Sequence, residues 1–178
     1  DGLFYFFQGE SLESLTRLEA YSRWGRLPNH GPETELMLGA LYLELGLHNE
    51  AGERFERLLG EAVPQGVRNR AWFYLAKVWY ARGYDGRAEQ AARRLQGALP
   101  ADLESERLHL LANVLMRQSR FAEAADLLDG WQGPDLWAAY ARFNLGVALI
   151  RDNQLDLGAR YLDAVGRLDT RGAELLAL

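Results

Sequence analysis

Small residues recur at two places along this chain, at nearly constant intervals. One set consists of Gly39, Ala76, Ala112 and Gly146, spaced by 37, 36 and 34 residues. The other set consists of Ala51, Ala88, Ala124 and Gly158, with the same three spacings of 37, 36 and 34. Because the spacing shortens by the same amounts in both sets, the two sets indicate a repeated unit of about 35 residues. Periods of that length are typical of helical repeat arrays.

The stretch from Arg70 to Ala88 shows most clearly what this unit is. Trp72, Leu75, Ala76 and Trp79 are spaced so that they share one face of an α-helix. Gly83 then ends the helix, and Ala88 lies in the next one. The unit is therefore a helical hairpin. We expect the residues of this stripe, with Ala88, to serve packing.

Small residues are needed where the two helices of a hairpin cross, because a bulky side chain would hold the backbones apart. Seven positions after the first small residue comes a residue suited to a turn. These turn residues are Gly46, Gly83, Ser119 and Asn153. The second helices also carry surface charge pairs such as Glu50 and Arg54, whose i,i+4 spacing favours an ion pair within one helix.

This pattern resembles the tetratricopeptide repeat (TPR) family, whose hairpins follow the motif W-x2-L-G-x2-Y…A-x3-F…P. The second repeat matches best, from Trp72 to Ala88, with Pro100 closing it. The resemblance covers residues 32 to 169 and implies an all-α, right-handed superhelical solenoid of antiparallel helix hairpins. The departures include Arg142 in place of the motif tryptophan and Gly158 in place of alanine.

The register divides the chain into hairpins joined by short connectors. The expected segments are a partial repeat at 1–22, a connector at 23–32, four repeats at 33–66, 67–101, 102–133 and 134–169, and the start of a fifth repeat at 170–178. The helices are expected at about 33–45, 48–61, 67–82, 85–97, 102–117, 120–130, 135–151 and 154–167. Both ends fall within a repeat, so we expect a longer array, with Phe4, Phe6 and Phe7 packing against structure beyond this sequence.

In the TPR family the first helices of the hairpins line a concave groove in which partners dock. Carried over by register, this resemblance assigns partner-binding roles to Arg70, Phe73, Tyr74, Lys77, Tyr80, His109, Asn113, Arg117, Tyr140, Phe143, Asn144 and Arg151. Such an aromatic and mildly basic groove suits a peptide with apolar anchors and some acidic character. The side-chain amides of Asn113 and Asn144 are suited to hold a peptide backbone, since each offers two donors and an acceptor.

Other classes of function find little support in the sequence. A net charge of −5 with interspersed signs argues against a nucleic-acid surface. There is no cysteine, and the three histidines, His30, His48 and His109, have no metal-site spacing. No apolar run reaches the roughly 18 residues of a membrane span. We therefore expect no metal, no cofactor and no enzymatic activity.

Two functions remain open. One is a protein-protein interaction scaffold, or adaptor, that binds a peptide or protein in the groove. The other is a structural spacer, or a segment that self-associates through exposed repeat ends. A chain that begins at Asp1 slightly favours a bacterial protein of the periplasm or cell envelope over a cytoplasmic one, because a start without methionine is compatible with a cleaved signal peptide.

Overall fold

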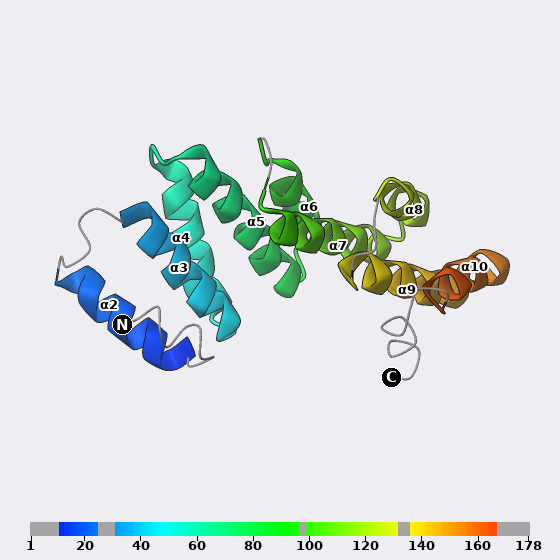
Figure 1. The fold of residues 1–178 in the computed structure, drawn as a ribbon, viewed down its shortest axis with the longest axis horizontal. Coiled ribbons are helices and arrows are strands. Elements are labelled where there is room, and N and C mark those ends of the chain that lie inside the picture. Colours follow the sequence, from blue (N-terminus) through cyan, green and yellow to red (C-terminus); the bar gives the residue numbers. More distant parts are fainter. Residues whose placement is uncertain (1–10, 25–30, 97–98, 132–135, 167–178) are drawn as a thin grey trace. The chain divides into compact units, whose positions relative to one another are not determined.

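A computed structural model describes residues 11–24, 31–96, 99–131 and 136–166, and within these ranges it contains helices and no strand (Figure 1). The chain divides into two compact units, Asp1–Ala98 and Leu99–Leu178. Each unit is described by itself below. The expectations for Phe4, Phe6, Phe7 and the fifth repeat lie outside the described residues.

Unit 1 contains five described helices. They are α2 (Ser11–Arg23), α3 (Gly31–Glu44), α4 (His48–Gly60), α5 (Gln65–Ala81) and α6 (Asp85–Arg93). Hairpin α3/α4 packs on hairpin α5/α6 through α4 and α5, and α2 packs on α3 (Figure 1). The core between α3, α4 and α5 includes Leu36, Phe55, Leu58, Val67 and Val78.

Unit 2 contains two hairpins. Its helices are α7 (Ala101–Arg117), α8 (Phe121–Asp129), α9 (Leu136–Arg151) and α10 (Leu155–Gly166). The first helices of the two hairpins, α7 and α9, pack on one another, and α8 and α10 each pack on α9. We call α3, α5, α7 and α9 the first helices, and α4, α6, α8 and α10 the second helices.

The expected helix ends agree with the structure to within about two residues, except at α6. This helix ends at Arg93 and not at residue 97. The reason lies in Asn69 on α5, which is buried. Its amide group donates to the carbonyl oxygen of Gln96 at 2.8 Å and accepts from the backbone N–H of Gln96 at 3.2 Å. These two bonds hold the backbone of Gln96 away from a helical path.

The eight small residues of the two periodic sets are all buried. A Cβ atom added to Gly39 would lie 2.5 Å from Cε1 of Phe55. At the fourth crossing both residues are glycine, and a Cβ atom on Gly158 would lie 2.7 Å from the carbonyl oxygen of Gly146. The glycine at position 158, a departure from the TPR pattern, thus matches a closer approach of α10 to α9.

The turn residue has positive φ in all four hairpins. The φ angles are 75° at Gly46, 79° at Gly83, 58° at Ser119 and 64° at Asn153. In each case two backbone bonds close the helix end; for example, the N–H of Arg120 donates to Leu115 and that of Ser119 to Met116. This is the Schellman arrangement, which favours glycine at the left-handed position.

We therefore expect Ser119→Gly to raise the free energy of unfolding by about 1 kcal/mol, because it removes the cost of a Cβ atom in a left-handed conformation. Gly83→Ala imposes that cost at the equivalent turn and should lower it by a similar amount. Urea unfolding followed by circular dichroism measures both changes. Equal stability of Ser119→Gly and the parent would show that this turn carries no strain.

Side chains from the first helices close the ends of second helices. Arg68 of α5 donates to the carbonyl oxygens of Leu59 and Glu61, at 3.1 Å and 2.7 Å. Arg142 of α9 donates to those of Leu128 and Trp131, at 2.7 Å and 3.1 Å. Carbonyl groups at a helix end lack partners within the helix. Arg142, which stands where the TPR motif has tryptophan, thus serves the end of α8.

Arg54 forms ion pairs between helices and not the expected pair with Glu50. Its guanidinium group pairs with Glu35 of α3 at 2.7 Å and with Glu19 of α2. The hydroxyl group of Tyr42 donates to the same Glu19 at 2.8 Å. The guanidinium group therefore links α4 to two helices that precede it.

Candidate functional site

Three polar side chains link the two first helices of unit 2. Nδ2 of Asn144 on α9 donates to Oδ1 of Asn113 on α7 at 3.1 Å. Nδ2 of Asn113 lies 3.0 Å from Nε2 of His109, one helical turn earlier on α7. We call these three half-buried residues the amide ladder. It joins three residues to which the sequence assigned a common role.

Within the amide ladder, the imidazole ring of His109 is neutral near pH 7. Burial lowers the pKa of His109 below its ordinary value of 6.5, and the nearby charge of Glu106 only partly opposes this shift. A neutral imidazole has one ring nitrogen without a proton. Nε2 can therefore accept a hydrogen bond from the amide of Asn113, and that bond fixes which way the Asn113 amide points.

Aromatic rings border the ladder. The ring of Trp137 on α9 lies 5.0 Å from the ring of His109 and 6.4 Å from that of Tyr140. Trp137 is 37% exposed. It was missed by the sequence analysis, although a signal was present, since Trp137 lies one helical turn before Tyr140 and so on the same side of α9.

The other assigned residues of unit 2 do not join the ladder. Phe143 is half-buried and packs, with Tyr140, on the small core formed by Ala139 and Val165. Arg117 and Arg151 are exposed in the last turns of α7 and α9. Their place in a groove stays a prediction.

In unit 1 three of the five assigned residues, Phe73, Tyr74 and Lys77, contact one another or the core. The ring of Tyr74 stacks on Phe55 with centroids 5.5 Å apart, and Nζ of Lys77 lies over the ring of Phe73 at 5.5 Å. Arg70 is half-buried and donates to Gly66 on its own helix, and Tyr80 is also half-buried.

Phe73, which was expected on the partner-binding surface, is instead buried. Its side chain is fully buried, packed 5.2 Å from the ring of Tyr74. The register placed Phe73 on the groove side of α5, but its ring fills the interior beneath Tyr74 and Lys77. It therefore supports this surface and is not available to a partner.

Trp72 and Trp79 pack on the core of unit 1 as expected, yet both are only half-buried. The rest of each ring borders a hollow of about 440 Å³ between α4, α5 and α6. The sequence contains one hint of this hollow: Trp72 and Trp79 are seven residues apart, and so are Arg87 and Arg94. Only the structure shows that the two pairs meet.

The described residues fit neither a metal site nor a membrane span. No group of three or more histidine, aspartate or glutamate side chains there is arranged to hold a metal ion. None of the helices in that part of the chain combines the length and apolar character needed to cross a membrane.

No protein-family model and no curated protein matches the sequence. Several solved structures do match the fold. One is the nearly identical TPR-like repeats of a kinesin light chain-like protein from Podosopora anserina, with a TM-score of 0.69 and 16% identity over 99% of this chain and 92% of that one. MamA matches with a TM-score of 0.67 and 16% identity, over 97% of this chain and 92% of MamA.

YrrB, described as a TPR protein with an unusual peptide-binding site, matches with a TM-score of 0.66 and 16% identity, over 99% of this chain and 89% of YrrB. All three likenesses extend over nearly the whole of both chains, and two of the three proteins are described as TPR or TPR-like. The chain therefore has the fold of the TPR-like repeat proteins, an all-α solenoid of helix hairpins.

Proposed function

We propose that this protein is a non-catalytic interaction scaffold, and that it binds a peptide or an extended protein segment on the face of unit 2 formed by α7 and α9. The observation that carries the proposal is the amide ladder. It places two asparagine side chains from neighbouring helices in one hydrogen-bonded chain.

The ladder leaves hydrogen-bonding capacity for a peptide backbone. A side-chain amide has two N–H donors and a carbonyl oxygen with two lone pairs. The bond between the two residues uses one N–H of Asn144 and one lone pair of Asn113. Because the internal bonds already fix both amides, a peptide would lose less entropy in ordering them than it would with freely rotating side chains.

The aromatic border supplies the apolar contact that such a peptide needs. Trp137 and Tyr140 present large rings beside the ladder, and aromatic residues are enriched at protein interfaces. Arg117 and Arg151 carry positive charge at the ends of α7 and α9. A peptide with an apolar side chain and a carboxylate suits this face. The peptide-binding site of YrrB is a property of that protein, and it supports the proposal only by likeness of fold.

The proposal is tested with peptides selected from a displayed random library on the immobilised full chain. We expect Asn113→Ala and Asn144→Ala each to weaken binding of a selected peptide about tenfold, which corresponds to about 1.4 kcal/mol and to the net contribution of roughly one hydrogen bond. Fluorescence anisotropy with a labelled peptide measures the dissociation constants.

The matched control is Asp163→Ala, an exposed position on α10 in the same unit, which should leave the dissociation constant unchanged. Circular dichroism confirms that all variants keep their helical content. Equal binding by the parent and both ladder variants would contradict the proposal. Light scattering that shows a mass rising with concentration, together with a failure to select any peptide, would favour the structural or self-associating alternative.

A further inference from the structure

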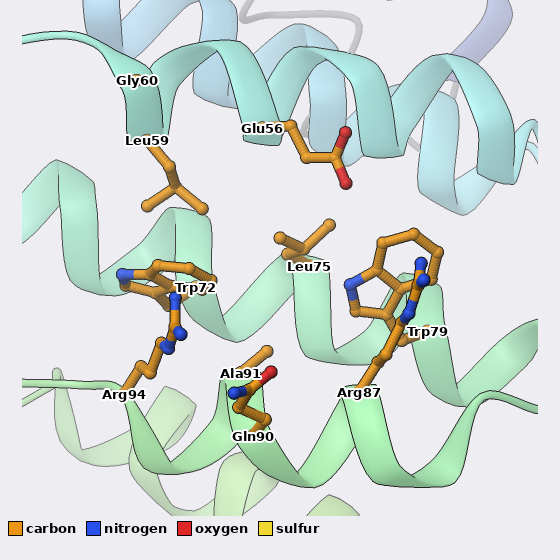
Figure 2. A pocket seen from close by; sticks show the side chains of 10 residues that line it. All are labelled: Glu56, Leu59, Gly60, Trp72, Leu75, Trp79, Arg87, Gln90, Ala91 and Arg94. Atoms are coloured by element: carbon orange, nitrogen blue, oxygen red, sulfur yellow. The ribbon is translucent and has the colours of Figure 1, made fainter.

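Unit 1 carries an open hollow on the side of its second helices, away from Tyr74 and Lys77. Helices α4 and α6 each pack on α5, and among the described residues they do not pack on one another. An outward strip of α5 is therefore left as the floor between them (Figure 2). The hollow measures about 440 Å³, within the range of known ligand sites.

The floor of this hollow is apolar. Trp72 and Trp79 stand at its two ends, with Leu75 between them (Figure 2). The two tryptophans are seven positions apart in α5, so they lie about 10.5 Å apart along the helix axis. Leu59 of α4 and Ala91 of α6 complete the apolar lining. The floor is thus about two helical turns long, with an aromatic ring at each end.

A guanidinium group lies against each tryptophan. That of Arg94 is centred 4.9 Å from the ring of Trp72, and that of Arg87 is 5.0 Å from the ring of Trp79. Stacking on an aromatic face leaves the N–H edge of a guanidinium group able to donate to oxygen atoms. Both arginines are exposed, and no carboxylate among the described residues forms an ion pair with either of them.

The opposite wall differs in charge. Glu56 lines the hollow from α4, so the α6 side is positive and the α4 side is negative (Figure 2). A ligand with carboxylates along one edge only would be attracted in one orientation and repelled in the other. This polarity argues for an occupant with a defined acidic edge.

We propose that the hollow binds one face of an acidic amphipathic helix from a partner protein. Carboxylates seven residues apart on that helix lie about 10.5 Å apart along its axis. Arg87 on α6 and Arg94, which follows the last residue of α6 and keeps a helical backbone conformation, have the same seven-residue spacing. Each guanidinium edge takes one carboxylate through paired hydrogen bonds. An aliphatic side chain three or four positions after the first carboxylate contacts Leu75 between the two tryptophans. This is the helix-in-groove mode of recognition. The site is separate from the amide ladder and does not depend on it.

The test uses three synthetic, fluorescently labelled peptides and the full chain. The first is an alanine-rich helix with two glutamates seven residues apart and a leucine pair midway between them. The second has lysines in place of the glutamates. The third has the sequence of the first except for one central alanine replaced by proline, which breaks the helix. Anisotropy titrations give a dissociation constant for each.

We expect the acidic helix to bind at least tenfold more tightly than both other peptides. Arg87→Glu should weaken it at least tenfold and improve binding of the lysine peptide. Arg160→Glu on α10 is the matched control, with the same change in charge at an exposed position of unit 2, and should alter binding less than twofold.

Three results would overturn the inference. They are equal losses for Arg87→Glu and Arg160→Glu, equal binding of the acidic and lysine peptides, and equal binding of the proline peptide. A loss caused by Asn113→Ala instead would place the acidic helix on the amide ladder. Because the ladder variants are tested on library-selected peptides, failure of either site is seen independently of the other.

Discussion

Replacing Gly158 with alanine is expected to lower the free energy of unfolding by about 3 kcal/mol, the upper end of the usual cost of overpacking. The added Cβ atom would lie 2.7 Å from the carbonyl oxygen of Gly146 and 3.1 Å from the backbone nitrogen of Ile150. Both obstacles are backbone atoms of α9, so no side-chain rotation relieves them. The two helices must move apart, and contacts around the crossing are lost.

Gly86→Ala is the matched control for this prediction. Gly86 also lies in a second helix, but a Cβ atom there meets nothing within 4 Å. Alanine restricts the unfolded chain and favours the helix, so this variant should gain about 0.5–1 kcal/mol. Urea unfolding followed by circular dichroism then gives changes of opposite sign for the same substitution. A Gly158→Ala variant as stable as the parent would show that α9 and α10 do not cross as closely as described.

Phe55→Ala is expected to cost about 3–5 kcal/mol, as is typical of a large core side chain replaced by alanine. Phe55 is fully buried in the core of unit 1, beneath Gly39 and stacked on Tyr74. Its removal leaves a cavity between α3, α4 and α5. Thermal unfolding monitored by circular dichroism should show a clearly lowered midpoint.

A double-mutant cycle with Gly39 identifies the source of this cost. Gly39→Ala alone forces its Cβ atom to within 2.7 Å of Cε1 and Cζ of Phe55, so it should destabilise the parent. Neither ring atom is present in Phe55→Leu, so the same Gly39→Ala change should cost at least about 1 kcal/mol less in that background, a coupling usual for residues in contact. Additivity of the two changes to within about 0.5 kcal/mol would contradict the described crossing.

The periodic features of this fold could be predicted from the sequence because they depend on local chain geometry. A close helix crossing excludes a bulky side chain at a fixed place in every hairpin, and this is why the two series that begin at Gly39 and Ala51 contain only glycine and alanine. The turn position is equally local. Ser119 and Asn153 adopt the same left-handed conformation as Gly46 and Gly83.

Features that depend on contacts between hairpins could not be predicted. Arg54 has a suitable partner at Glu50, yet it pairs with Glu19 and Glu35. In the sequence, Arg142 is only a departure from the motif. The structure shows that it donates a hydrogen bond to the carbonyl oxygen of Leu128 at the end of α8. Such contacts depend on where a long side chain reaches in three dimensions, which sequence spacing does not specify.

The candidate site shows the same division. Register assigned His109, Asn113 and Asn144 to one side of the first helices, but it did not show that the three bond to one another. Register also assigned Phe73 to the groove side of α5, but it could not show how deeply the side chain is buried, and the structure shows that it is fully buried. The pairing of Trp79 with Arg87 needed the packing of α6 on α5.

The most direct test of the proposed function is an NMR titration of the full chain with a library-selected peptide, observing the side-chain amide signals of asparagine. The signals of Asn113 and Asn144, assigned by loss in the alanine variants, are expected to shift as the peptide saturates the protein. The amide signals of Asn49 and Asn69 in unit 1 serve as internal controls and should stay in place. Saturable binding that leaves both ladder signals unchanged would contradict the proposal that this face of α7 and α9 holds the peptide.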